Sequence, residues 1–233
     1  MDSIIAQYDK IYLEKLIAYN HVLQQRNSLL KHFYETRSFD EMSLEIWDEQ
    51  LLIHGQGIID IRTTFLNEFA PLFMKYYQFI SCSNEEVSIH YDSSVKELSY
   101  KVQLTAALAK DRVVHYTTVG PHRDDLEFKL LNNSLKKFAS QGQQKSYLLA
   151  LKLAQFELIN QKKNTKPLLL LDDIYDKLDE TRFKQLIKLV SDDNFGQVFI
   201  TDTHVDRIKY LFENSTTECR IFEVKDGEIY SAI

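Results

Sequence analysis

The chain has 233 residues, 44% of them hydrophobic and 12% aromatic, and a formal net charge of −6 at pH 7. This length allows one large domain or two modest ones with a buried core, and the acidic balance argues against strong autonomous binding to nucleic acid, because phosphate contacts need basic surface. The two cysteines and the seven scattered histidines have the spacing of neither a metal site nor a redox pair. No apolar run is long enough to span a membrane. We therefore expect a cytoplasmic protein without membrane contact.

The first third of the chain has the pattern of two long helices. Apolar residues recur every three or four positions over residues 3–35, without glycine or proline, which predicts one long amphipathic helix. A polar break follows, with Asp40 and Ser43 as plausible caps, and a second helical pattern covers about 44–77. Pro71 is expected to kink or interrupt the second helix. Two long helices joined by a short break predict an antiparallel helical hairpin.

After residue 81 the pattern becomes mixed. Residues 87–91 alternate like a strand, and 94–111 returns to a helical pattern. The Asn132–Asn133 dipeptide is a signal for a two-residue hairpin turn. Further strands are expected from β-branched or apolar runs between turn residues, at 113–119, 126–131, 134–139, 168–172 and 197–201.

Two more helices and a final hairpin complete the predicted elements. The helices cover about 142–162 and 180–191, and the hairpin covers 219–233 with its turn at Asp226–Gly227. The fold class is therefore α/β, or α+β overall. We expect a helical arm over residues 1–112 and an α/β lobe over residues 113–233.

Acidic residues follow the apolar run 168–171. Asp172 at the end of a buried strand could hold Mg²⁺ through water, and Asp173 could orient or deprotonate an attacking water. The alternative is a helix cap followed by a surface acid. Asp179 could merely begin a helix, where acids are favoured near the positive end. No G-x-x-x-x-G-K-[ST] phosphate-binding loop and no Gly-Lys dipeptide accompany these acids in the 233 residues.

The loop over residues 139–146 has the features of an anion-binding helix start. Ser140 can cap the helix that follows, and Gly142 lets backbone N–H groups approach an anion closely. The positive end of the helix dipole points at the same place, and Lys145 adds charge. The alternative is an ordinary N-cap with a glutamine-rich first turn.

Four segments together resemble the RecF DNA replication and repair proteins, relatives of the SMC-type ABC ATPases. They are GPHRDDL (120–126), FASQGQQKSYLLALKLAQ (138–155), LLLLDDIYDKLDETR (168–182) and QVFITDT (197–203). The likeness extends into the helical arm and therefore covers the whole chain. It implies the C-terminal part of an ABC/SMC-like ATPase head with a long helical-hairpin arm, lacking the N-terminal lobe that carries the phosphate-binding loop.

The resemblance also implies roles for individual residues. Asp172 would hold Mg²⁺, Asp173 would be the catalytic carboxylate, and Asp179 would be the D-loop acid that crosses a dimer. His204 would be a switch histidine, although the family usually has threonine there, so Thr201 or Thr203 could take that position. The signature residues would contact the partner's γ-phosphate: Ser140, Gln141, Gly142 and Gln143. No role follows for Arg123.

For the whole protein, the resemblance implies an ATP- and Mg²⁺-dependent homodimer that binds gapped DNA or single-strand/double-strand junctions. RecR would be a partner, and loading of RecA would be the outcome. The chain alone is expected to be inactive, because it has no loop for the β- and γ-phosphates. Two alternatives remain open: a non-enzymatic interaction module, and another SMC-like ATPase head with a shortened coiled coil.

Overall fold

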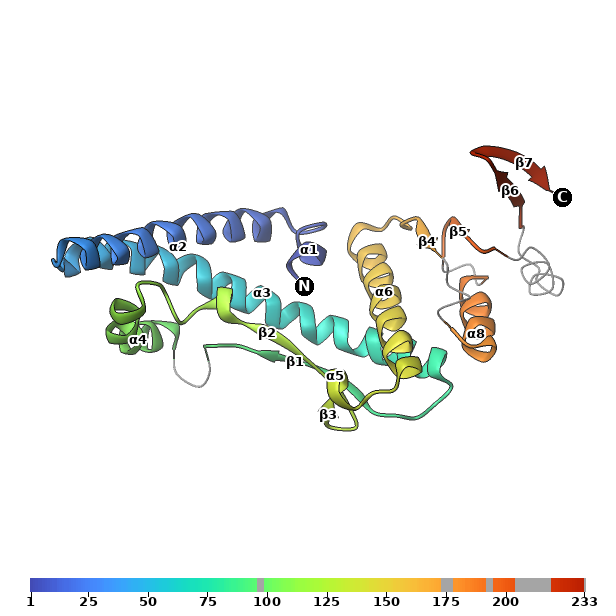
Figure 1. Cartoon of the computed structure of the whole chain (residues 1–233), viewed down its shortest axis with the longest axis horizontal. Helices are drawn as coiled ribbons and strands as arrows, with labels where there is room; N and C mark the ends of the chain where they lie inside the picture. Colours follow the sequence, from blue (N-terminus) through green and yellow to red (C-terminus); the bar gives the residue numbers. More distant parts are fainter. Residues whose placement is uncertain (96–98, 173–177, 192–194, 204–218, 233) are drawn as a thin grey trace.

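The computed structural model of the protein describes residues 1–95, 99–172, 178–191, 195–203 and 219–232. Two long helices run antiparallel and side by side through the helical arm, and a second pair of helices stands at the other end of the molecule (Figure 1). The predicted mixed class of helix and strand and the helical hairpin are both confirmed. The N-terminal helices are α1 (Asp2–Ile5), α2 (Lys10–Thr36) and α3 (Glu41–Ser81).

The single helix predicted over residues 3–35 is wrong, because the chain leaves the helical conformation after α1. Asp9 begins α2 by accepting a hydrogen bond from the backbone N–H of Tyr12 at 2.8 Å. An aspartate side chain that satisfies a free N–H in this way favours a new helix start over helix continuation. The predicted cap at Asp40 is confirmed for α3, whereas Ser43 donates to Asp40 instead of capping.

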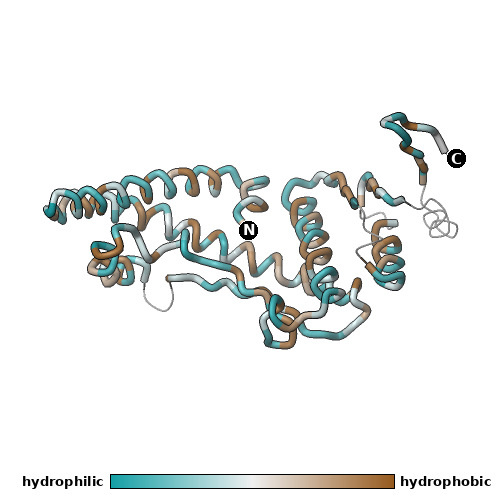
Figure 2. Tube along the Cα trace, viewed as in Figure 1, coloured by the Kyte–Doolittle hydropathy of each residue, from teal (hydrophilic) through white to brown (hydrophobic). Residues whose placement is uncertain are grey.

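Helix α3 continues through Pro71, so the expected interruption does not occur. A proline inside a helix removes one hydrogen bond and costs about 3 kcal/mol. The residues on both sides bury large side chains, with Phe69 and Phe73 only 4% and 0% exposed. Packing of this kind supplies most of the stability of helices in proteins, and here it outweighs the local cost. Figure 2 shows hydrophobic residues recurring along α3 up to its C-terminal end.

An antiparallel sheet of order β1-β2-β3 lies along α3. Its hairpin turn is formed by Leu131 and Asn132, whose φ values are 49° and 64°, so the predicted Asn132–Asn133 turn is displaced by one residue. Turns with two positive φ values match the twist of paired strands, and asparagine tolerates them. The elements of this region are β1 (Val87–Asp92), α4 (Tyr100–Val114), the 3₁₀ helix η1 (Pro121–Arg123), β2 (Asp125–Leu130), β3 (Asn133–Ser134) and α5 (Leu135–Phe138).

Two strands and one helix boundary predicted in this region are wrong. Residues 113–119 do not form a strand: Val113 and Val114 end α4, and His115 then adopts a left-handed conformation with φ 62°. Residues 134–139 are mostly the short helix α5. The helix predicted over 94–111 begins only at Tyr100, after Ser99 caps it. In each place tertiary contacts and caps override the β-propensity or periodicity of a few residues.

The remaining elements agree with prediction to within one or two residues. A two-stranded parallel sheet pairs Leu170 with Phe199, and the final hairpin turns at Asp226 and Gly227, with φ values of 54° and 82°. The elements are α6 (Gln141–Lys163), β4 (Leu169–Leu171), α8 (Glu180–Val190), β5 (Val198–Ile200), β6 (Ile221–Lys225) and β7 (Glu228–Ala232).

One hydrophobic core runs from Ile5 to Phe195 and joins the arm to the C-terminal lobe. Tyr147 on α6 is central to it: its ring lies 4.5 Å from that of Phe73 and 5.9 Å from that of Phe128, and its hydroxyl donates to the carbonyl oxygen of Ser88 at 2.8 Å. These contacts fix the start of α6 against α3, β1 and β2. The division predicted at residue 112 therefore cuts across a continuous core, and as a functional division it stays a prediction.

Candidate functional site

The turn that begins α6 is built by its own polar side chains. The hydroxyl oxygen of Ser140 accepts from the backbone N–H of Gln143 at 3.2 Å, and Gln143 Oε1 accepts from the backbone N–H of Ser140 at 2.8 Å. This reciprocal capping box confirms the predicted cap. We call residues 140–143 the signature turn. Ser140 and Gln141 are exposed, so the positive end of the α6 dipole faces solvent and can accept an anion. Lys145 lies exposed in the first helical turn.

A second hydrogen-bonded chain ties the signature turn to the end of α3. Gln143 Nε2 donates to Glu85 Oε1 at 2.7 Å, and the buried Tyr77 hydroxyl donates to Glu85 Oε2 at 2.8 Å. Burial raises the pKa of Glu85, but the hydrogen bonds from Tyr77, Gln143 and Ser83 outweigh it and lower the pKa overall. Glu85 therefore stays ionised and continues to accept both hydrogen bonds at neutral pH.

Asp179 and Arg182 lie at the start of α8, against the signature turn. Asp179 is the N-cap, as one sequence alternative suggested, because Oδ1 accepts from the backbone N–H of Arg182 at 2.9 Å. Its other oxygen pairs with Arg182 Nη1. The hydrogen bond from the Arg182 backbone N–H lowers the pKa of Asp179, and the charge of the Arg182 guanidinium lowers it further. Partial burial acts in the opposite direction, but the pKa stays below its ordinary value. A Cβ added to Gly142 would lie 2.8 Å from Arg182 Nη1, so the guanidinium rests directly on this glycine.

Asp172 lies exposed at the carboxyl end of β4, beside the carboxyl end of β5. The Thr201 hydroxyl donates to Asp172 Oδ1 at 2.5 Å, and the Thr201 N–H donates to the Leu171 carbonyl oxygen at 3.0 Å. The structure thus brings together Asp172 and Thr201, the last residues of two predicted strands. Thr203 follows β5 two residues further on. Asp173 and His204 lie outside the described residues.

The oxygen atoms at Asp172 suit the expected Mg²⁺ in type. A carboxylate at a strand end, with a threonine hydroxyl beside it, offers the hard oxygen ligands that Mg²⁺ prefers. The described part of the chain contains no group of three or more His, Cys, Asp or Glu side chains that could hold a metal. Mg²⁺ retains several waters and shares its shell with substrate phosphates, so a single protein carboxylate fits such a site.

The segment 120–126 lies between the arm and the sheet, and its first two residues, Gly120 and Pro121, are buried. Asp124 accepts hydrogen bonds from the Tyr91 hydroxyl and from the backbone N–H of Ser94 (2.7 Å). Gly120 has φ 136°, and a Cβ there would lie 2.4 Å from the hydroxyl oxygen of Tyr100. Only glycine fits both this backbone conformation and this space. Arg123 is exposed, with its guanidinium 4.9 Å from the Tyr116 ring centre, so the structure assigns it a surface cation–π contact.

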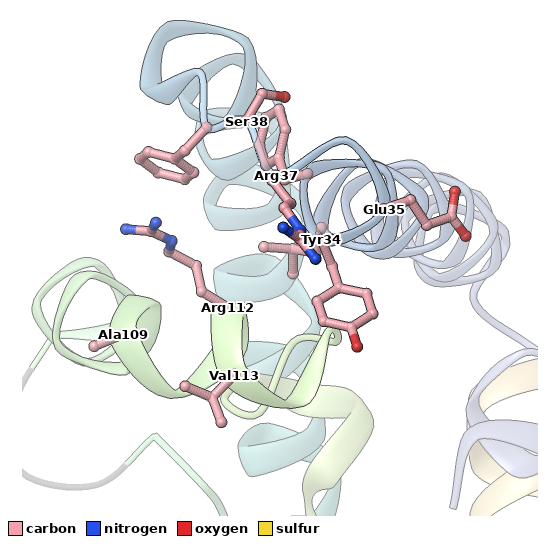
Figure 3. Close-up of a pocket in the computed structure, with 10 residues that line it drawn as sticks. Tyr34, Glu35, Arg37, Ser38, Ala109, Arg112 and Val113 are labelled. Carbon is pink, nitrogen blue, oxygen red and sulfur yellow. The ribbon is translucent and has the colours of Figure 1, made fainter.

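A pocket of about 710 Å³ opens at the far tip of the arm, away from these residues (Figure 3). It lies between the C-terminal ends of α2 and α4, with Arg37 and Arg112 among its lining residues. Arg112 stacks 3.9 Å from the Phe39 ring centre, and the Tyr34 and His115 rings are 4.0 Å apart. The pocket contains none of the sequence-predicted site residues. No helix within the described ranges is both long and apolar enough to cross a membrane.

Sequence reasoning missed the residues that hold the signature turn in place. Arg182 and Glu85 carry no motif of their own, and the contact between them and the turn spans segments far apart in sequence. The three-residue spacing of Asp179 and Arg182 is the one signal that could have indicated their ion pair, because residues three apart face each other on a helix.

Comparison with known proteins identifies the family. A RecF DNA replication and repair protein from Flavobacterium johnsoniae is 45% identical over 224 residues, covering 96% of this chain and 62% of the relative. The RecF protein of Phocaeicola vulgatus is 44% identical over 230 residues, covering 98% of this chain and 61% of that protein. This chain belongs to the RecF family. It spans about three fifths of the length of these curated relatives. No protein-family profile matches it.

Solved structures agree with this assignment. A structure of the recombination mediator protein RecF with ATP, from the RecFOR pathway, matches with a TM-score of 0.81 at 34% identity. It covers 100% of this chain, which in turn covers 61% of that chain. A RecF–ATPrS structure matches with a TM-score of 0.80 at 32% identity. The chain thus has the fold of the matching part of these RecF structures.

Proposed function

We propose that this chain is part of an ATP-dependent DNA-binding protein of recombinational repair and replication-gap processing. The observation that carries the proposal is the exposed, capped start of α6 in a fold that matches a RecF–ATP structure. A helix start with exposed polar residues, Ser140 and Gln141, at the positive end of the helix dipole is suited to a phosphate group. Ser140, Gln141, Gly142 and Gln143 would contact the γ-phosphate of a nucleotide held by a second copy, so that ATP joins a homodimer.

The β4–β5 edge would supply the chemistry next to the nucleotide. Asp172 would hold Mg²⁺, whose charge polarises the phosphate, and Thr201, which already bonds Asp172, would keep that carboxylate oriented. By resemblance, Asp173 would position or deprotonate the attacking water, and His204, Thr201 or Thr203 would take the switch position. Asp179 would reach across the dimer interface.

The sheet itself supports a larger nucleotide-binding lobe. Leu169 and Leu171 are buried on one face of β4, but Leu168 and Leu170 are 62% and 70% exposed and Phe199 on β5 is 48% exposed. Parallel sheets occur almost only with both faces covered. We therefore infer that further structure, carrying the phosphate-binding loop, packs on this bare face in the active protein.

The arm and the partners complete the proposal. Residues 1–112 would act as the arm and residues 113–233 as the ATPase lobe of a cytoplasmic protein. The ATP-bound dimer would engage gapped DNA or single-strand/double-strand junctions, with RecR as its partner and RecA loading as the outcome. These expectations rest on the likeness to RecF of the RecFOR pathway.

The decisive experiment separates binding of ATP by one copy from ATP-dependent association of two copies. In a full-length protein that carries these residues, Ser140→Arg places bulk and positive charge where the partner's γ-phosphate docks. We expect nucleotide affinity of the monomer to stay nearly unchanged, while ATP-dependent dimerisation in sedimentation experiments and ATP hydrolysis are both lost. Ser28→Arg on the exposed face of α2 is the matched control and should change neither. Equal loss of monomer binding and dimerisation would show that the turn serves the chain's own nucleotide.

A further inference from the structure

Arg182 lies between two segments of the proposed ATP site. Its Nη1 pairs with Asp179, and its backbone N–H is capped by the same carboxylate at 2.9 Å. On the other side, a Cβ added to Gly142 would lie 2.8, 3.5 and 3.6 Å from Nη1, Cζ and Nη2 of Arg182. The guanidinium thus lies against the bare Cα of Gly142, and any side chain at position 142 would have to displace it.

A second contact to the signature turn comes from Glu85. Gln143 Nε2 donates to Glu85 Oε1 at 2.7 Å, and the hydroxyl of Tyr77 on α3 donates to the other carboxylate oxygen of Glu85. Arg182 is close enough to Glu85 for its positive charge to stabilise that carboxylate. The first turn of α6 therefore contacts both an arginine from α8 and a glutamate from the α3–β1 connection.

The orientation of Arg182 carries a cost. Its Nε atom is buried and has no hydrogen-bond partner within the described part of the chain. A buried donor left unsatisfied is unfavourable and calls for an explanation. The explanation here is geometric, because the orientation that pairs Nη1 with Asp179 and also covers Gly142 leaves Nε facing neither group.

We propose that Arg182 is a positioning residue that couples Asp179 to the signature turn, so that both segments meet the partner copy's nucleotide as one unit. This inference rests on the proposed function, in which both segments act across the dimer interface. Groups that must stabilise one transition state together need a fixed relative position, and small displacements are costly in rate. Arg182 supplies that fixed position without touching the nucleotide itself.

The first test uses kinetics of a full-length protein that carries these residues. Arg182→Ala should lower kcat about tenfold or more, while KM and the monomer's ATP affinity change by less than about twofold, because only alignment is lost. Arg182→Lys should recover part of kcat, since it keeps the charge beside Asp179. The matched control is Lys184→Ala on the same helix, which removes the Lys184–Glu180 ion pair and should leave kcat unchanged. An unchanged kcat in Arg182→Ala, or an equal loss of ATP affinity, would overturn the inference.

The second test measures the coupling directly. In the 233-residue chain, Gly142→Ala should speed exchange of the Gln143 and Gln144 amides, but it should have little further effect on this exchange in an Arg182→Ala background, because the side chain that it displaces is gone. Independent, multiplying effects would contradict the coupling.

Hydrogen exchange in the 233-residue chain separates this inference from the proposed function. Arg182→Ala should speed exchange of the Gln143 and Gln144 amides by about tenfold, since both hydrogen bonds close the first turn of α6. Lys184→Ala should not. If Arg182→Ala speeds amide exchange but the full-length protein shows no ATP-dependent association, the coupling is supported and the proposed function is contradicted. Unchanged exchange would overturn the coupling whatever the ATPase shows.

Discussion

Arg26 on α2 and Asp111 on α4 form a fully buried ion pair, with 2.7 Å between Nη1 and Oδ2. Arg26 also donates to Asp48 on α3 at 2.5 Å and to Thr117 Oγ1 at 2.8 Å. Burial lowers the pKa of Arg26, but the hydrogen bonds to Asp48 and Asp111 outweigh it and raise the pKa overall. One buried cation on α2 therefore joins this helix to α3 and α4.

We expect Asp111→Ala to lower the free energy of unfolding by about 3–5 kcal/mol, because it leaves Arg26 without its buried partner. It also removes the acceptor of two hydrogen bonds from Thr118. Urea denaturation measures the effect. Glu14→Ala, which breaks the exposed pair with Lys10, should cost no more than about 0.5 kcal/mol. Equal effects of the two substitutions would show that the buried pair is open to water.

Two glycines on α3 should respond in opposite directions to alanine. A Cβ at Gly55 would lie 2.5 Å from the Tyr100 ring, so Gly55→Ala should destabilise the protein by about 1–3 kcal/mol through overpacking. A Cβ at Gly57 would meet only the flexible end of Lys15, at 3.2 Å. Gly57→Ala should therefore stabilise by about 0.5–1 kcal/mol, from helix propensity. Thermal unfolding of the two variants compares them, and the same sign for both would contradict the packing of Tyr100.

His122 should make stability depend on pH below its ordinary pKa of 6.5. Burial, and then the charge of Arg123, lower its pKa against the opposing effects of Thr117, Asp124 and Asp111. The neutral ring accepts from the Tyr19 hydroxyl at Nδ1 (2.7 Å) and donates from Nε2 to the Thr117 carbonyl oxygen (3.0 Å).

The sign of the effect follows from proton binding. Just below pH 6.5 the unfolded chain binds a proton at this histidine that the folded chain does not, so the free energy of unfolding falls as the pH falls. For this single group the slope is at most about 1.4 kcal/mol per pH unit. His122→Gln should flatten the dependence between pH 7 and 5.5 in urea titrations. Exposed His32→Gln is the control and should preserve it.

The helical hairpin should depend on Leu51, which is fully buried on α3. Leu51→Ala should cost about 2–5 kcal/mol, the range for large-to-small changes in a core. Ile53 lies two residues away on the opposite face and is 61% exposed, so Ile53→Ala should change stability by less than about 0.5 kcal/mol. Guanidinium denaturation distinguishes the two, and a small effect at Leu51 would mean that α2 does not cover that face in solution.

Local signals predicted most elements correctly because the physical cause was local. The Asp40 cap, the capping box at Ser140 and the Asp226–Gly227 turn each satisfy backbone groups within a few residues of themselves. Predictions failed where distant contacts decide the outcome. Val113 and Val114 favour a strand by propensity, yet they complete α4, which is held to the arm by the buried Asp111.

The candidate site was predictable in its motifs and not in its geometry. Three site residues are recognisable from their position next to a predicted element. Ser140 and Asp179 each cap the start of a helix, and Asp172 lies at the end of a strand. The contacts of Arg182 and Glu85 with the signature turn depend on how distant segments pack together. No spacing in the sequence indicates this packing.

The length of α3 has a mechanical consequence. With 41 residues it spans about 60 Å, its early turns packed against α2 and its last turns against α6 through Phe73 and Tyr77. If the helix moves as a rigid body, a tilt of about 5° at the α6 end displaces the opposite end by about 5 Å over that length. A small displacement of the signature turn, which keeps its hydrogen bonds, would thus become a larger displacement at the arm tip. There it would be large enough to change the contacts with a bound molecule.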